Sequence, residues 1–259
     1  MYLKNILQMG SLMLHFRNGR TLVECMRADR PCDELVLWDG TRIQHPAGRA
    51  GLLEAVQEIW IERIYTDGFY RPQSGDVIVD AGANIGLFAI YLARQNSQCK
   101  VFALEPVEEN FRYLEKNVAQ AAPANVTCCQ MALGAAFGQG RMEAVGTRSL
   151  DHMLRAGGNG NSDVVPVIPL AGLFELTGAQ KIDFLKVDIE GSERDVFAAA
   201  PAETLTRIGR IAMEYHDQIT PGTLALVREK LAPSHDITVR PSHMEGCGIL
   251  LARPRGAES

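Results

Sequence analysis

The stretch DVIVDAGANIG, residues 76–86, decides the fold of this 259-residue chain. An apolar run typical of a buried strand leads directly into a glycine-rich turn and then into an apolar helix. Glycine lets the backbone turn tightly and approach a ligand closely, and the first turn of the following helix has unpaired N–H groups. The stretch therefore predicts a cofactor-binding loop, with Gly82 and Gly86 filling these two roles.

The residue before the turn indicates which cofactor the loop binds. A dinucleotide loop has the pattern G-x-G-x-x-G, in which the middle glycine lets a pyrophosphate lie against the backbone. Here Asp80 stands where the first glycine would be, and its carboxylate would repel a pyrophosphate but attract a cation. S-adenosylmethionine carries an ammonium and a sulfonium group, so the loop favours this cofactor over NAD. The next apolar run ends at Glu105, 23 residues after Gly82 (105 − 82), where an acceptor for ribose hydroxyls is expected.

Three motifs, in this order, resemble those of the FkbM-type methyltransferases. They are Asp80-Ala81-Gly82-Ala83-Asn84-Ile85-Gly86, Ala103-Leu104-Glu105-Pro106, and Lys186-Val187-Asp188-Ile189-Glu190-Gly191-Ser192-Glu193. The resemblance covers about residues 60–252, and residues 1–58 carry none of the motifs. It implies a class I, S-adenosylmethionine-dependent enzyme of a family whose members are mostly O-methyltransferases of natural products and sugars.

Strand and helix patterns alternate after Gly75. Strands are expected at 76–80, 101–104, 126–130, 182–187, 209–214, 235–240 and 247–252, and helices at 86–95, 108–120, 192–199 and 221–231. This alternation predicts an α/β, Rossmann-like fold with a mostly parallel sheet of seven strands and helices on both faces. The class I resemblance implies that the last strand is antiparallel. We expect a helical and strand extension at residues 1–58 and the methyltransferase domain at residues 59–259.

Two regions lie outside this alternation. An apolar stripe in residues 1–16 (Leu3, Ile6, Leu7, Met13, Leu14) predicts a packing helix, with a homodimer contact or a membrane-surface contact as alternatives; the run is too short to span a bilayer. Residues 20–48 are expected to form short strands and turns, and residues 50–65 a helix. Residues 133–146 could form a hairpin. The glycine- and asparagine-rich segment 147–163, which includes His152, predicts a lid over the acceptor.

Composition limits the class of partner. The chain is 46% hydrophobic and 22% charged, which is typical of a globular protein. A net charge of −5 and a pI near 5.7 argue against a nucleic-acid partner, which normally requires a basic face. The six cysteines form no C-x-x-C pair, so they are expected to be reduced thiols of a cytoplasmic protein.

Ligands of open α/β sheets bind beyond the carboxyl ends of the strands, which defines the candidate site residues. The candidates are Asp80, Gly82, Asn84 and Gly86 after the first sheet strand, Glu105 after the second, Gln130 and Met131 after the third, Asp188 and Glu190 after the fourth, and Glu214, His216 and Asp217 at the fifth. The resemblance implies that Asp80 and Gly82 lie beside the methionine part of the cofactor and Glu105 at the ribose. Gln130 and Met131 are assigned to the adenine by position.

The fourth and fifth strand ends carry the catalytic candidates. Asp188 lies on the strand side of a glycine and is assigned a cofactor or catalytic role, together with Glu190, while Ser192 and Asp195 have the spacing of a helix capping box. His216 is the candidate general base, because the usual pKa of histidine lies near neutral pH. Asp188, Glu214 and His216 also offer ligands for a divalent metal such as Mg²⁺, which would acidify a substrate hydroxyl.

These residues predict methyl transfer from S-adenosylmethionine to a hydroxyl oxygen of a small molecule, such as a natural product or a sugar. Two alternatives stay open. One is methyl transfer to an amine or amide nitrogen with the same fold and cofactor. The other is a catalytically silent module that binds S-adenosylmethionine, because a fold does not by itself imply a function.

Overall fold

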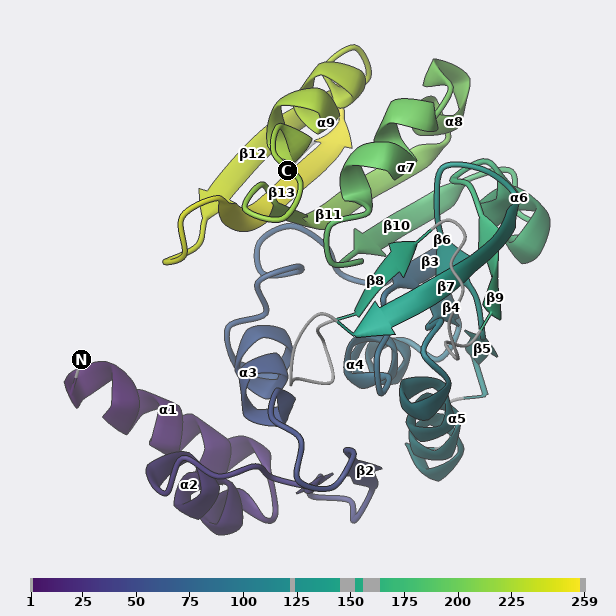
Figure 1. Ribbon diagram of the computed structural model, residues 1–259. Helices are drawn as coiled ribbons and strands as arrows, with labels where there is room; N and C mark the ends of the chain where they lie inside the picture. Colours follow the sequence, from purple (N-terminus) through teal and green to yellow (C-terminus); the bar gives the residue numbers. More distant parts are fainter. Residues whose placement is uncertain (1, 122–123, 145–151, 156–163, 257–259) are drawn as a thin grey trace.

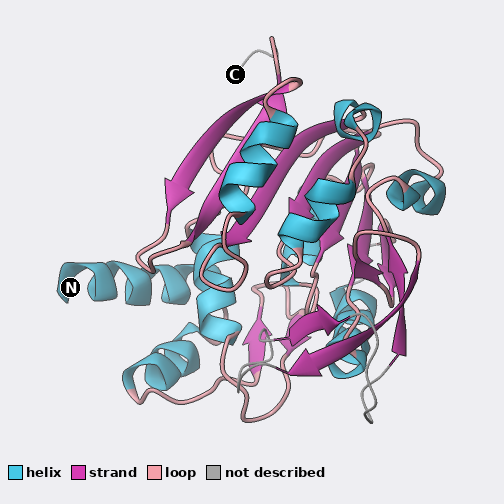
Figure 2. Cartoon of the chain, turned by 45° about the horizontal axis from the view of Figure 1, so that its top comes forward, coloured by secondary structure: helices cyan, strands magenta, loops and turns pink. Residues whose placement is uncertain are grey.

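A central sheet of seven strands forms the middle of the molecule in the computed structural model, which describes residues 2–121, 124–144, 152–155 and 164–256 (Figures 1 and 2). The strands are β3 (Val77–Ala81), β4 (Lys100–Leu104), β5 (Val126–Cys129), β10 (Ile182–Val187), β11 (Ile208–His216), β12 (His235–Pro241) and β13 (Cys247–Pro254). Their order is β12-β13-β11-β10-β3-β4-β5, and only the two pairs that involve β13 are antiparallel. The predicted mostly parallel sheet with an antiparallel last strand is therefore confirmed.

Alternate residues of each strand enter different hydrophobic cores, because successive side chains point to opposite faces of a sheet. Ile78 and Phe184 belong to one core, and their neighbours Val79 and Leu185 belong to the other. Helices α4 (Leu87–Gln95) and α5 (Glu108–Ala121) cover the first face. Helices α6 (Gly172–Thr177), α7 (Glu193–Ala199), α8 (Ala202–Thr206) and α9 (Thr223–Leu231) cover the second. Helices on both faces were predicted, and this part is confirmed.

The N-terminal segment packs against the first face and shares its core. It consists of α1 (Tyr2–His15), α2 (Gly19–Arg27), the hairpin of β1 (Glu34–Val36) and β2 (Arg42–Gln44), α3 (Leu52–Val56), and the single π-helical turn η1 (Gln57–Ile61). Helix α2 corrects the expectation of only strands and turns in residues 20–48. It forms because Leu22 and Val23 are buried against the core, and because Gly19 lets its backbone approach α1, where a Cβ would lie 2.5 Å from the carbonyl oxygen of Leu12.

The buried residues of α1 also differ from the predicted stripe. Leu12, in the last turn of this helix, and Phe16, directly after it, are buried, whereas Leu7 and Leu14 are 66% and 76% exposed. Met13 is exposed as well, and the side chains of residues 2–6 lie outside the described part. The helix was predicted correctly but its packing side was not, because Leu12 and Phe16, which lie outside the predicted stripe, are the residues that reach the core. No helix within the described residues is both long and apolar enough to cross a membrane.

A second, smaller sheet interrupts the alternation between β5 and β10. Its strands are β6 (Ala132–Leu133), β7 (Gly138–Ala144), β8 (His152–Arg155) and β9 (Val164–Ile168), in the order β6-β9-β7-β8. The hairpin predicted within residues 133–146 is wrong, because β7 pairs with β8 and β9, which come later in the chain. Most of the predicted lid, residues 147–151 and 156–163, lies outside the described residues, and of His152 only the backbone is described.

Candidate active site

The loop after β3 brings its backbone against the end of β10. Gly82 has a φ of +79°, and a Cβ there would lie only 1.7 Å from the carbonyl oxygen of Asp188. Any other residue type at position 82 would force either this loop or the end of β10 to move. Gly86, with a φ of +89°, precedes α4, and a Cβ there would lie 2.6 Å from a methyl carbon of Leu114. Gly82 thus allows a close approach at the sheet edge, whereas Gly86 allows close helix packing.

A buried lysine, Lys186, joins this loop to two carboxylates. Its Nζ lies 3.3 Å from the Asp80 carboxylate on the neighbouring strand and 3.3 Å from that of Asp188, and it donates to the carbonyl oxygen of Gly82 at 3.0 Å. Burial lowers the pKa of Lys186, but the two carboxylates more than offset this effect, so the side chain stays protonated. Asp80 is fully buried, so any influence on a bound cofactor would be indirect, through Lys186 and the Gly82 carbonyl.

Glu105, at the end of β4, is fastened to two loops. One carboxylate oxygen accepts the backbone N–H of Asn84 at 2.8 Å, and the other accepts that of Val107 at 2.9 Å. Burial raises the pKa of Glu105 to about 7, although both hydrogen bonds act in the opposite direction. Asn84 has a φ of +50°, which asparagine tolerates better than most residues. The carboxyl is therefore held at a defined place between the loop after β3 and the loop after β4.

A narrow cavity of about 60 Å³ lies beyond the carboxyl ends of β3, β4 and β10. It is lined by Gly82, Asn84, Glu105, Pro106, Val107, Asn110, Met131, Ala132, Leu133, Met142, Asp188, Ile189, Glu190 and Ser192. Six of the candidate residues therefore meet at one place: Gly82, Asn84, Glu105, Met131, Asp188 and Glu190. The other six candidates do not line this cavity: Asp80, Gly86, Gln130, Glu214, His216 and Asp217.

The ends of β10 and β11 hold a cluster of carboxylates around His216. Its Nδ1 lies 3.0 Å from Oε1 of the fully buried Glu193, and its Nε2 lies 3.5 Å from Glu190 and 3.9 Å from Glu214. Burial by itself would lower the pKa of His216, but the hydrogen bond to Glu193 and the surrounding carboxylates raise it to about 10. In this environment the imidazole holds its proton at neutral pH, which does not suit a general base.

The same cluster has the donor set of a divalent-cation site. One ligand atom each from Asp188, Glu214 and His216 lie within 4.8 Å of one another. Because Nδ1 of His216 is occupied by Glu193, Nε2 is the nitrogen that faces the other two residues. A carboxylate that orients a ligating histidine in this way is common around protein metals. The donor types would suit a divalent cation such as Mg²⁺ or Mn²⁺ only once the proton on Nε2 of His216 is displaced.

Sequence patterns missed two of the residues that organise this site. The sequence analysis gave Glu193 no role beside the predicted Ser192–Asp195 capping box, but the Ser192 side chain makes no capping hydrogen bond. Instead Glu193 accepts the backbone N–H of Gly191 at 3.1 Å, in addition to its bond with His216. Lys186 was read as part of a strand. A lysine within a buried apolar run was the one available signal, since a lysine is rarely fully buried without a partner.

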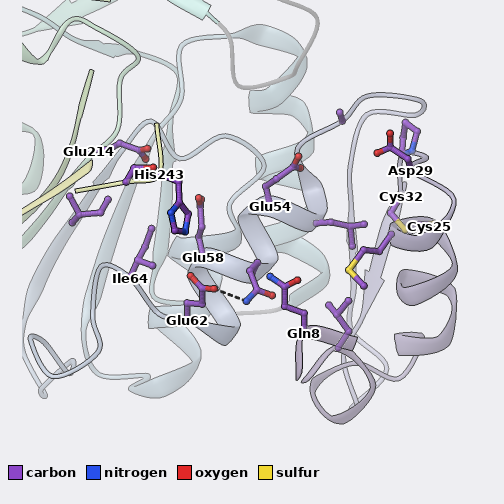
Figure 3. A pocket seen from close by; sticks show the side chains of 18 of the residues that line it. Gln8, Cys25, Asp29, Cys32, Glu54, Glu58, Glu62, Ile64, Glu214 and His243 are labelled. Carbon is purple, nitrogen blue, oxygen red and sulfur yellow. Dashed lines mark hydrogen bonds between the residues drawn. The ribbon is translucent and has the colours of Figure 1, made fainter. Parts of the chain in front are cut away.

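A larger cavity of about 590 Å³ lies next to this cluster, between the N-terminal segment and the ends of β11 to β13 (Figure 3). Glu214 lies on its wall, and the Tyr65 hydroxyl donates to Glu214 at 3.1 Å. Burial, and then the nearby Asp188 charge, raise the pKa of Glu214 to about 8. Glu58 on η1 lines the same cavity, and its pKa is raised to about 7, mainly by burial.

Comparison with known proteins identifies one family. The model of the methyltransferase FkbM domain matches residues 80–236 of the chain. The 31-O-demethyl-FK506 methyltransferase FkbM of Streptomyces tacrolimicus is 27% identical over 216 residues, covering 71% of this chain and 82% of that protein. The AMB antimetabolite synthetase AmbE of Pseudomonas aeruginosa is 26% identical over 200 residues, covering 62% of this chain but only 9% of AmbE. Among solved structures, a methyltransferase from Pyrococcus furiosus is similar with a TM-score of 0.46 and 15% identity, covering 93% of this chain and 98% of that one.

Proposed function

The chain belongs to the FkbM methyltransferase family, and we propose that it transfers a methyl group from S-adenosylmethionine to a hydroxyl oxygen of a small-molecule acceptor. The observation that supports the cofactor most directly is the position of Glu105. Its carboxyl is held by two backbone N–H groups and lines the narrow cavity beside Gly82 and Asp188. A carboxylate at the end of the second sheet strand is where ribose hydroxyls are bound in folds of this type.

The narrow cavity suggests how the cofactor would lie. Glu105 would accept hydrogen bonds from the ribose, Met131 would contact the adenine, and Asp188 and Gly82 would lie beside the methionine part. When bound, the cofactor supplies an activated methyl group for in-line transfer, and the protein contributes mainly by positioning the two reactants. At about 60 Å³ the cavity is smaller than usual for a ligand of this size, so side chains such as Met131 and Ile189 would have to move on binding.

Calorimetric titration tests the cofactor. We expect S-adenosylmethionine and S-adenosylhomocysteine to bind and NAD not to bind, because no middle glycine makes room for a pyrophosphate. The Glu105→Ala variant should bind both adenosyl compounds more weakly by about 1–3 kcal/mol. Binding of NAD without binding of either adenosyl compound would overturn the proposal. Tight cofactor binding without turnover of any hydroxylated acceptor would favour the silent binding module instead.

The acceptor hydroxyl must lose a proton, and the cluster at the ends of β10 and β11 offers two ways to remove it. One is general-base catalysis by His216, as its position predicts. The other is a divalent cation held by Asp188, Glu214 and His216, which would lower the pKa of the hydroxyl. The raised pKa of His216 counts against both possibilities, because a protonated imidazole can neither accept a proton nor bind a metal, so a cation would have to displace the proton on Nε2.

Turnover with and without a chelator separates the two mechanisms. If His216 is the base, His216→Ala should lower turnover roughly 10²–10⁴-fold with cofactor affinity nearly unchanged, and chelators should have no effect. If a cation is required, a chelator should abolish turnover in the unchanged enzyme, and Mg²⁺ or Mn²⁺ should restore it. Full turnover after both treatments would rule out both mechanisms and leave positioning alone.

A further inference from the structure

The larger cavity is a second candidate binding site, and it is built from segments distant in the sequence. Its walls come from α1 to η1 on one side and from Glu214 and the connection between β12 and β13 on the other (Figure 3). Gln8 and Met26 from the N-terminal segment line it together with Pro241 and Ile249 from the C-terminal strands. At about 590 Å³ it has the size of a typical small-molecule site.

This cavity adjoins the narrow cavity at one pair of carboxylates. Glu214 lines the larger cavity and Asp188 lines the narrow one. One carboxylate oxygen of Glu214, one of Asp188 and one ring nitrogen of His216 all lie within 4.8 Å of one another. A molecule in the larger cavity could therefore present an atom to this junction, which is where a methyl group would be transferred if the proposed function holds.

A row of three glutamates faces the larger cavity. Glu54 on α3, Glu58 on η1 and Glu62 directly after η1 follow one another at four-residue intervals, and Figure 3 shows their side chains on the cavity side of this segment. Like charges at this spacing destabilise a helix. Among the described residues, no lysine or arginine forms a salt bridge with any of the three. The row therefore lowers the stability of the helix, and a cationic ligand would offset that cost.

A π-helical turn accompanies the row. The N–H of Glu62 bonds to the carbonyl of Gln57 at 2.8 Å, five residues earlier, so the helix is widened beside Glu58. Turns of this kind are rare and are found frequently at functional sites. The turn leaves Glu58 half-buried, whereas Glu54 and Glu62 are exposed. Glu58 is consequently the member of the row that a ligand would desolvate most.

The remaining lining gives the cavity its overall chemistry. Five acidic side chains line it (Asp29, Glu54, Glu58, Glu62, Glu214) against two guanidinium groups (Arg30, Arg240), which gives a formal charge of 2 − 5 = −3 when all five are ionised and His243 is not counted. The pKa values of about 7 for Glu58 and about 8 for Glu214 mean that these two carry only part of their charge near neutral pH, and a bound cation would favour their ionised forms. Apolar side chains form the rest of the wall, among them Leu12, Leu53, Ile64 and Ile249. A ligand that fits this lining has a positive group on an apolar body.

We propose that the larger cavity binds the methyl acceptor, and that the acceptor carries a protonated amine, bound by the Glu54–Glu58–Glu62 row, on an apolar body. The identification of the ligand as the acceptor rests on the proposed function, whereas its positive charge rests on the cavity alone. The N-terminal segment, which carries none of the family's motifs, is then the part of the chain that selects the acceptor.

Matched ligand pairs test this proposal without any methyl transfer. The probes are tyramine, phenylalaninol and octyl glucosaminide, each compared with its N-acetyl derivative, which keeps the hydroxyl and the apolar body but loses the charge. Dissociation constants are measured by calorimetry on the full chain without cofactor. We expect at least one amine to bind about tenfold more tightly than its N-acetyl partner, as for a hydrogen bond to a charged group.

Two variants locate the effect. Glu58→Gln keeps the shape of the side chain and removes its charge, and it should abolish the preference for the amine while the unfolding temperature stays at or above that of the unchanged protein. Glu229→Gln, on the exposed side of α9, is the matched control and should keep the preference. The proposal would be overturned if Glu58→Gln still preferred the amines to their N-acetyl derivatives. It would also be overturned if the unchanged protein showed no such preference in any of the three pairs, or bound none of the probes.

The result is separable from that of the cofactor titration. Amine binding that depends on Glu58 in a protein that does not bind S-adenosylmethionine would refute the proposed function and leave this cavity as a cation-binding site. Cofactor binding without any amine preference would refute only the present inference. Transfer of the methyl group to the amine rather than the hydroxyl would replace O- by N-methylation and retain the site.

Discussion

At the scale of single residues, a glycine can be required for its left-handed φ angle or for the lack of room for a Cβ atom, and Gly82 is required for both. Gly75 and Gly82 have φ angles of +89° and +79°, but a Cβ at Gly75 would meet nothing within 4 Å, whereas one at Gly82 would lie 1.7 Å from the backbone of Asp188. We expect Gly75→Ala to cost about 1–2 kcal/mol of unfolding free energy, the cost of the left-handed conformation alone. Gly82→Ala should cost clearly more and weaken cofactor binding, as measured by denaturant unfolding and titration of each variant. Equal losses in the two variants would show that the loop can move away from β10.

Glu105 leads to a prediction about pH. Its pKa of about 7 means that the carboxyl is largely neutral below pH 7, whereas ribose hydroxyls are bound better by the carboxylate. Affinity for S-adenosylhomocysteine should therefore fall as the pH is lowered below 7, approaching about tenfold per pH unit, and should level off above pH 8. Glu105→Gln, which cannot ionise, should lack this dependence. Titration of the ligand itself affects both proteins equally, so the difference between their affinities at each pH reports on Glu105 alone. Parallel pH profiles would contradict the assignment.

At the scale of secondary-structure elements, the strands β3 and β10 are joined by charge as well as by backbone pairing. Asp80 and Lys186 lie at paired positions of the two strands, and both are buried. Lys186→Met should cost about 3–5 kcal/mol, because it leaves two carboxylates without their cation. Asp80→Asn combined with Lys186→Met should recover part of this loss. Lys181→Met, which removes the exposed pair with Asp183 at the start of the same strand, should cost no more than about 1 kcal/mol. Denaturant unfolding of the four proteins measures these differences, and equal costs for the two lysines would refute the structural role of Lys186.

At the scale of the whole molecule, the N-terminal segment and the sheet share one hydrophobic core. Phe16 is 1% exposed, and its ring centroid lies 5.8 Å from that of Trp60 within a core that also contains Phe88 and Phe184. Phe16→Ala should cost about 3–5 kcal/mol, whereas Leu14→Ala, two residues earlier and 76% exposed, should change stability by less than about 0.5 kcal/mol. Both variants should unfold in a single transition followed by circular dichroism. A separate early transition in Phe16→Ala would mean that the segment folds independently of the sheet.

The sequence by itself determined the class of fold and the glycine-rich turn after the first sheet strand, because their signals are local. Alternation of apolar runs with helical patterns predicted all seven strands of the sheet, and DVIVDAGANIG combined a buried strand, a tight turn and a helix start within 11 residues. The antiparallel direction of the last strand followed from the family resemblance, whereas the order of the strands was not predicted. Candidate residues at strand ends were predicted for the same reason, since parallel strands all end at one edge of the sheet.

Only the tertiary structure decided which of those residues meet and what charge they carry. Lys186 holds Asp80 and Asp188 together, and Glu193 holds His216, across contacts that no spacing in the sequence encodes. The larger cavity exists because residues 8–64 fold against residues 240–249, and its glutamate row is visible as a row only once α3 and η1 are seen to face that cavity. The pKa of His216 depends on burial and on carboxylates from other segments, and both arise when distant parts of the chain pack together.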